Sequence, residues 1–133
     1  MQKIVIDTNI VISAALTPNG NAARIVKSIY EGKVQAFYSP DIINEYKKVL
    51  SYERLNISHE KQKITIDAIS NLFVQVTPAT SCIHMLHEDD RVFYDTAKEA
   101  GAILITGNTK HFPAEQFIMS PTEYLDKYFT QEN

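Results

Sequence analysis

The chain has 133 residues, of which 44% are hydrophobic, so it is long and apolar enough to build a core, and extensive disorder is not expected. Its 13 basic and 16 acidic residues give a formal net charge of −3. This balance excludes the strongly basic character of a typical nucleic-acid-binding domain, although a local basic patch or a bound cation can override it. The single cysteine, Cys82, excludes an internal disulfide and agrees with a reducing compartment.

Short apolar runs alternate with longer segments of helical pattern along the whole chain. Strands are predicted at residues 3–7, 34–38, 74–77 and 102–106, with a short edge strand within 116–120. Helices are predicted within residues 19–32, 39–55, 58–73 and 89–101, and from Ser120 to about Phe129. The caps and stops that delimit these helices are Asn21, Ser39, Ser58 and Ser120 at the beginnings and Gly32 and Gly101 at the ends.

Strands that are apolar throughout and alternate with helices indicate a parallel sheet covered on both faces, which is a three-layer α/β/α sandwich. We expect residues 1–133 to form one such domain. No apolar run reaches the roughly 18 residues that span a bilayer, and the N-terminal apolar stretch is too short for a signal peptide. We therefore expect a cytoplasmic protein that does not associate with a membrane.

In a parallel sheet, functional residues gather at the carboxyl ends of the strands, and polar residues of this chain occur there. Asp7 ends the first strand, Asn108 follows the fourth, Asp90 opens the preceding helix, and Glu45 lies within the helix after the second strand. Each acid alone has a structural explanation. Asp7 can cap the next helix at the N–H of Ile10, Glu45 can be half-exposed beside an apolar face, and Asp90 can complement a helix dipole.

Together, these carboxylates at one rim of the sheet would repel each other. A hard divalent cation relieves that repulsion, and Mg²⁺ or Mn²⁺ suits a few carboxylates completed by water. The set of acids therefore favours a metal site over three independent structural roles.

Three segments, in this order, resemble the motifs of the PIN-domain family: "IVIDTNI", "SPDIINEYKKVL" and "HEDDRVFYDTAKEAGAILITGNTKHF". The resemblance covers nearly the whole chain and implies that Asp7, Glu45 and Asp90 are the catalytic acids. It further implies a parallel α/β/α sandwich, Mg²⁺- or Mn²⁺-dependent ribonuclease activity, and a homodimer or higher oligomer. Within the family, the chain resembles the toxins of bacterial or archaeal toxin–antitoxin modules, so a cognate antitoxin that blocks the site is expected.

The resemblance also implies roles around the acids. Asp7, Glu45 and Asp90 would hold one or two cations, Thr8 and Asn9 would orient Asp7, Asn108 would position a metal-bound water, and Thr106 would support Asn108. Basic residues near the rim are candidates for contacts with the RNA backbone, although each is also explained as ordinary surface charge: Lys48, Arg91, Lys110 and His111.

One position departs from the family pattern. Many members carry an aspartate where this chain has Asn108, which accepts a hydrogen bond but brings no charge. Asp89 or Asp95 are candidates to compensate, although neither shares the helix face of Asp90. The change is compatible with a weakened second metal site, a one-metal arrangement or reduced activity. The alternative function is therefore a catalytically weak PIN domain that binds RNA or a protein.

Other candidate sites have weaker support. The tract "CIHMLH" at residues 82–87 has zinc-ligand residue types but lacks a second cluster, so a surface loop is preferred. Phe93 and Tyr94 are candidates for stacking on bases, with core packing as the default. A receiver-type phosphate-acceptor domain also has acids at the rim of a parallel sheet, but the acids of this chain occur in the wrong order.

Overall fold

The computed structural model describes residues 1–129 and contains one five-stranded sheet in which all strands run parallel. The strand order is β3-β2-β1-β4-β5, so the first strand lies at the centre. The strands are β1 (Gln2–Ile6), β2 (Val34–Tyr38), β3 (Val74–Gln75), β4 (Ile103–Ile105) and β5 (Ile118–Met119).

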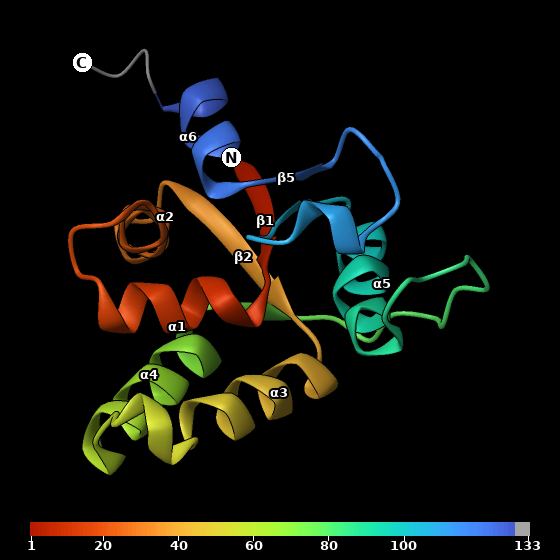
Figure 1. The fold of residues 1–133 in the computed structure, drawn as a ribbon. Coiled ribbons are helices and arrows are strands. Elements are labelled where there is room, and N and C mark those ends of the chain that lie inside the picture. The colour runs from red at the N-terminus through yellow and green to blue at the C-terminus, as the bar shows by residue number, and fades with distance from the viewer. Residues whose placement is uncertain (130–133) are drawn as a thin grey trace.

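Helices cover both faces of this sheet. The α-helices in the described part of the chain are α1 (Thr8–Leu16), α2 (Asn21–Tyr30), α3 (Pro40–Leu50), α4 (His59–Leu72), α5 (Arg91–Ala100) and α6 (Pro121–Tyr128). Short 3-10 helices occur at η1 (Glu53–Leu55), η2 (Glu88–Asp90) and η3 (Thr109–His111). In Figure 1, α1 and α2 lie on one side of β1 while α5 lies on the other. The predicted three-layer α/β/α fold with a parallel sheet is confirmed.

The register of the central strands brings separate parts of the chain to one edge. Ile6 of β1 pairs with Ile105 of β4, and the N–H of Asp7 donates to the carbonyl of Ile105 at 2.9 Å. Because parallel strands end at the same edge of a sheet, Asp7 and Thr106 come side by side although 99 positions separate them. Ile4, Val5 and Ile6 are buried completely or nearly so, which fixes the strand that presents Asp7.

Local capping explains most helix boundaries. The hydroxyls of Ser39, Ser58 and Ser120 each accept a backbone N–H three residues later, as predicted. Gly101 has a φ of +63°, a conformation that glycine adopts without strain, and it ends α5. The prediction that Asn21 caps α2 is wrong, because Gly20 occupies the cap position and the Asn21 amide donates to the Thr122 hydroxyl.

Several predicted boundaries shift. The helix predicted over residues 39–55 ends at Leu50. There the Ser51 N–H is shared between the carbonyls of Lys47 and Lys48, the Ser51 hydroxyl also donates to the carbonyl of Lys48, and η1 follows as a separate turn. The first residues predicted for the helix at 89–101 belong to η2, and α5 begins at Arg91. The third strand has two residues instead of four, although the Val76 N–H still donates to the carbonyl of Tyr38. No bounds were predicted for the helix after Asp7, which is α1 in the structure, and the last helix ends one residue early at Tyr128.

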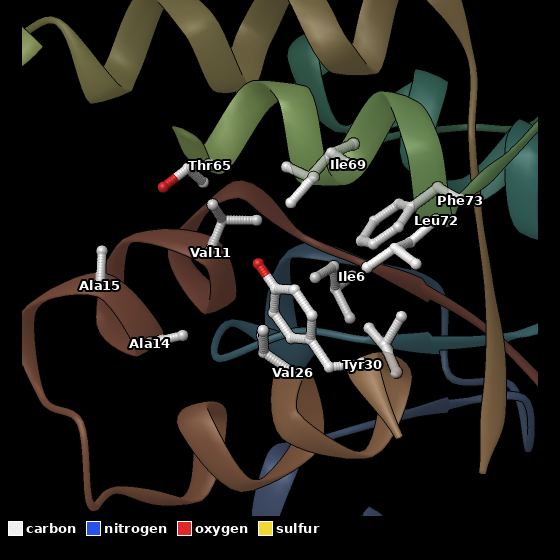
Figure 2. Close-up of a pocket in the computed structure, with 12 residues that line it drawn as sticks. Ile6, Val11, Ala14, Ala15, Val26, Tyr30, Thr65, Ile69, Leu72 and Phe73 are labelled. Atoms are coloured by element: carbon white, nitrogen blue, oxygen red, sulfur yellow. The ribbon is translucent and has the colours of Figure 1, made fainter. Parts of the chain in front are cut away.

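An apolar cavity of about 200 Å³ lies between α1, α2 and α4. Figure 2 shows Val11 from α1, Tyr30 from α2 and Ile69 from α4 pointing into it. No helix within residues 1–129 is both long enough and apolar enough to cross a membrane.

Candidate active site

A depression of about 280 Å³ lies at the carboxyl edge of the sheet and contains the predicted acids. Its lining residues are Asp7, Thr8, Asn9, Glu45, Val49, His87, Asp89, Asp90, Phe93, Asn108 and His111. The fold thus brings together all three proposed catalytic acids and Asn108 from four separate segments. Of the basic residues predicted to contact RNA, His111 lines the depression, whereas Lys48, Arg91 and Lys110 do not.

Asp7 both caps a helix and faces the depression. Its side chain is held on two sides, because Oδ1 accepts the Thr8 N–H at 2.7 Å and Oδ2 accepts the Thr106 hydroxyl at 2.7 Å. The N–H of Ile10, predicted to bond to this side chain, donates instead to the backbone carbonyl of Asp7 at 3.0 Å. Burial raises the pKa of the Asp7 carboxyl, and the hydrogen bonds from Thr106 and Thr8 oppose that rise.

Thr106 joins two parts of this site. Its fully buried hydroxyl donates to Asp7 and also accepts the Asn108 N–H at 3.0 Å. One side chain therefore fixes the orientation of the Asp7 carboxylate and the path of the backbone that carries Asn108.

Asp90 occupies the cap position of α5 but makes no capping hydrogen bond with its side chain. Its Oδ2 is buried without a hydrogen-bond partner among the described residues. Nδ1 of His111 lies 3.5 Å from this oxygen and can form an ion pair with it when the histidine is protonated. Burial and the negative charge of Asp7 raise the pKa of the Asp90 carboxyl, while His111 and His87 oppose the rise. The two aspartates are therefore close enough to repel each other, as expected of acids that share one site.

Glu45 reaches the same depression from α3, where it is half-buried while Lys47 and Lys48 are exposed. The next residue, Tyr46, is fully buried, and its hydroxyl donates to the carbonyl of Ile6 at 2.6 Å. Ile6 directly precedes Asp7, so this one hydrogen bond links the helix that carries Glu45 to the strand that carries Asp7. The sequence offered no signal for this link, since Tyr46 reads as an ordinary core residue.

The donor set suits a hard cation. Among residues 1–129, no group of three His, Cys, Asp or Glu side chains is gathered closely enough to hold a metal ion. Two oxygens at the depression are nevertheless buried without hydrogen-bond partners in the described part of the chain, Oδ2 of Asp90 and Oγ1 of Thr8. Carboxylate, hydroxyl and amide oxygens are the ligands that Mg²⁺ and Mn²⁺ take, and burial without partners is costly unless something satisfies such atoms. The residues present thus have the oxygen ligands that a divalent cation takes, although the carboxylates are not already close enough together to coordinate one.

Arg91 and Asp95 fix the loop that leads into the site. The Arg91 guanidinium bonds to the Glu88 carboxylate and to both oxygens of Ser81, and Oδ2 of Asp95 accepts the Ser81 N–H at 3.1 Å. Asp95 therefore faces this loop and not the other acids, whereas Asp89 does line the depression. Asp89 and Asp95 were the two candidates to replace the negative charge that Asn108 lacks, and of these two only Asp89 lines the depression.

His87 lines the depression although the sequence analysis assigned it to a surface loop. Residues 82–87 do form a loop, and Cys82 is exposed. The ring of His87 lies 4.4 Å from the ring of His111, measured between centroids. This pairing joins residues 24 positions apart, so no local pattern could have indicated it. Phe93 and Tyr94, predicted as candidates for stacking on RNA bases, are not accessible to a base. Phe93 is 2% exposed, and Tyr94 is buried with its hydroxyl bonded to Glu115.

Comparison with known proteins places this arrangement in a family. The family described as PIN domain matches residues 3–110, which include all three acids and Asn108. The chain belongs to the PIN-domain family. This PIN domain is also 37% identical over 109 residues to an uncharacterized protein of Methanocaldococcus jannaschii, and the alignment covers 80% of this chain and 70% of the relative. PIN domains are generally nucleases that act on RNA, so the acidic depression is the candidate active site of this PIN domain.

Proposed function

We propose that this protein is a metal-dependent endoribonuclease that hydrolyses phosphodiester bonds of RNA at the acidic depression. The observation that carries the proposal is the convergence of Asp7, Glu45 and Asp90, with a buried oxygen of Asp90 that has no hydrogen-bond partner within residues 1–129. Three acids with independent structural roles, such as helix capping, would not be expected to lie in one depression.

Asp7, Glu45 and Asp90 would hold one or two Mg²⁺ or Mn²⁺ ions, with Asn108 acting through a water molecule. Such an ion lowers the pKa of a water molecule and neutralises charge that develops on the phosphoryl oxygens. Thr8 and Thr106 hold the Asp7 carboxylate in one orientation, and the exposed Asn9 lies beside it. Because Thr106 also accepts the backbone N–H of Asn108, the backbone that carries Asn108 is held at a fixed position relative to Asp7.

The RNA backbone would be contacted by cationic side chains around the depression. Lys48 and Lys110 are exposed near its rim, and His111 lines it. Arg91 has its guanidinium bonded to Glu88 and Ser81, so we propose that it acts on RNA through the loop that it holds.

A second candidate function rests on Asn108. A neutral amide at this position reduces the charge available to a cation, which favours a catalytically weak domain that binds RNA or a protein. Binding of RNA without cleavage in the presence of Mg²⁺ and Mn²⁺ would support this alternative.

We further propose that the protein is the cytoplasmic toxin of a toxin–antitoxin module, assembles as a homodimer or higher oligomer, and is inhibited by a cognate antitoxin protein. The support is the resemblance of its three motifs to toxin members of the family. A small upstream reading frame that overlaps the gene would support the antitoxin, and light scattering on the purified protein would measure the oligomer.

The deciding experiment is cleavage of a mixed RNA pool with Mg²⁺, Mn²⁺ or EDTA, using the wild type and Asp90→Asn. We expect either metal to support cleavage by the wild type, and EDTA or Asp90→Asn to abolish it. Asp67→Asn is the matched control, because it makes the same change at an exposed carboxylate of α4 that pairs with Lys63 and does not line the depression. Cleavage that persists in both EDTA and Asp90→Asn would show that the proposed site is not responsible.

A further inference from the structure

His87 and His111 form one side of the depression. His111 lies beside Asp90, with Nδ1 3.5 Å from Oδ2, and His87 packs against His111 with the ring planes at 52°. His87 is exposed, so part of its ring is open to solvent at the rim. We propose that His87 is the surface on which an unpaired base of the RNA substrate stacks, next to the cleaved phosphodiester. This inference rests on the proposed ribonuclease function.

The other aromatic side chains near the acids cannot take this role. Phe93 lines the depression but is 2% exposed, and Tyr46 is fully buried beneath it. Tyr94 is buried, and its hydroxyl bonds to Glu115. Among the residues described, the histidine pair is therefore the aromatic surface that the depression offers to a ligand.

His87 is held in place before any RNA arrives. Its carbonyl accepts the Asp90 N–H at 3.1 Å, and the adjacent Glu88 is bonded to Arg91. Arg91 in turn holds Ser81, so the loop on which His87 lies is fastened to α5 at two points. A stacking surface that is already ordered loses little conformational entropy when a base binds.

The acidic character of the site explains why stacking is suited to this position. Asp7, Asp89 and Asp90 all line the depression and would repel the RNA backbone in the absence of a cation. Stacking on an aromatic ring adds affinity that does not depend on charge and tolerates every base. Bases within an A-form duplex are already stacked and paired, so only an unpaired nucleotide can present its face to a side chain.

The test compares His87→Gln with His87→Phe, because only the second keeps an aromatic ring. The measurements are KM and kcat for cleavage of a short 5′-fluorescein-labelled single-stranded RNA, and of the same strand annealed to its complement. We expect His87→Gln to raise KM for the single strand about tenfold with little change in kcat, and His87→Phe to restore KM. His84→Gln is the matched control, because His84 is exposed on the same loop but does not line the depression.

The results distinguish failure of the stacking role from failure of the ribonuclease proposal. An unchanged KM in His87→Gln, or a KM as high in His87→Phe as in His87→Gln, would overturn the stacking role while leaving the ribonuclease proposal intact. Equal KM values for single-stranded and duplex RNA in the wild type would also overturn it. Absence of metal-dependent cleavage by the wild type would overturn the ribonuclease proposal itself, and the stacking role with it.

Discussion

The hydrogen bond from Tyr46 to the carbonyl of Ile6 gives the sharpest test of how the site is held together. Tyr46→Phe removes only the hydroxyl and leaves the ring in place. A neutral hydrogen bond contributes about 1 kcal/mol to stability, and leaving its buried partner unsatisfied adds a further cost of similar size. We therefore expect the free energy of unfolding to fall by about 2 kcal/mol, which is a large part of the stability of a typical domain.

The chain supplies a matched control for this change. Tyr124 is also fully buried, but its hydroxyl has no hydrogen-bond partner among residues 1–129. Tyr124→Phe deletes the same atom and removes a buried polar group without a partner, so we expect it to be neutral or stabilising. The difference between the two variants isolates the hydrogen bond of Tyr46.

Urea denaturation at pH 7 measures both free energies, and the slopes should match the wild type if only stability changes. Because Tyr46 adjoins Glu45 and Ile6 adjoins Asp7, we also expect Tyr46→Phe to lower the rate of RNA cleavage several-fold while Tyr124→Phe leaves it unchanged. Equal effects of the two substitutions on stability would show that this bond does not tie α3 to β1.

Three further predictions follow from the described contacts. Thr106→Val removes the bonds to Asp7 and to the Asn108 N–H, and we expect a loss of about 2 kcal/mol of stability in urea denaturation, together with a higher pKa of the Asp7 carboxyl. The pKa of the Asp90 carboxyl is higher in the folded state than its unfolded value of about 3.8. The protonated carboxyl therefore favours the folded state fully below the unfolded pKa, and this stabilisation is lost as the pH rises through the folded pKa. We therefore expect Asp90→Asn to be more stable than the wild type at pH 7 in EDTA, with the advantage disappearing at pH 3. Ala14→Leu places three more carbons in the apolar cavity, and we expect it to raise the unfolding free energy by about 1 kcal/mol in urea denaturation.

Each of these has a result that would contradict it. Thr96→Val is the control for Thr106→Val, because the Thr96 hydroxyl is also buried but has no partner among the described residues, and equal losses would show that the bonds of Thr106 are unimportant. A wild type that is more stable than Asp90→Asn at pH 7 in EDTA would show that this carboxylate is not destabilising. A loss of stability in Ala14→Leu would mean that the cavity cannot accept the larger side chain.

Much of the fold is predictable because its causes are local. Continuous apolar strands that alternate with helices indicated the parallel sheet, and serine caps such as Ser39 marked where helices begin. The error at Asn21 arose because Gly20 and Asn21 are adjacent residues that both suit an N-cap, and a distant contact with Thr122 decides between them. The early end of α3 depends on Ser51, whose type alone does not distinguish a helix interior from a helix end.

The site was predictable only in part. Asp7 was identified because it interrupts an apolar pattern at the end of a strand, whereas Glu45 and Asp90 were indicated by their place near the rim of the sheet and by the resemblance of their motifs. The fold brings Asp7, Glu45 and Asp90 into one depression. The bond of Tyr46 to Ile6 and the packing of His87 on His111 depend on residues 40 and 24 positions apart, so tertiary structure alone reveals them.

We propose above that the acidic depression cleaves RNA with the help of a divalent cation. The most direct test is the single-turnover rate of cleavage of one labelled single-stranded RNA in Mg²⁺ by the wild type and by Asp7→Asn, with folding of both verified by circular dichroism. We expect the rate to be at least about 100-fold lower in Asp7→Asn, because this carboxylate is one of the three proposed metal ligands. Cleavage by folded Asp7→Asn at the wild-type rate would contradict it.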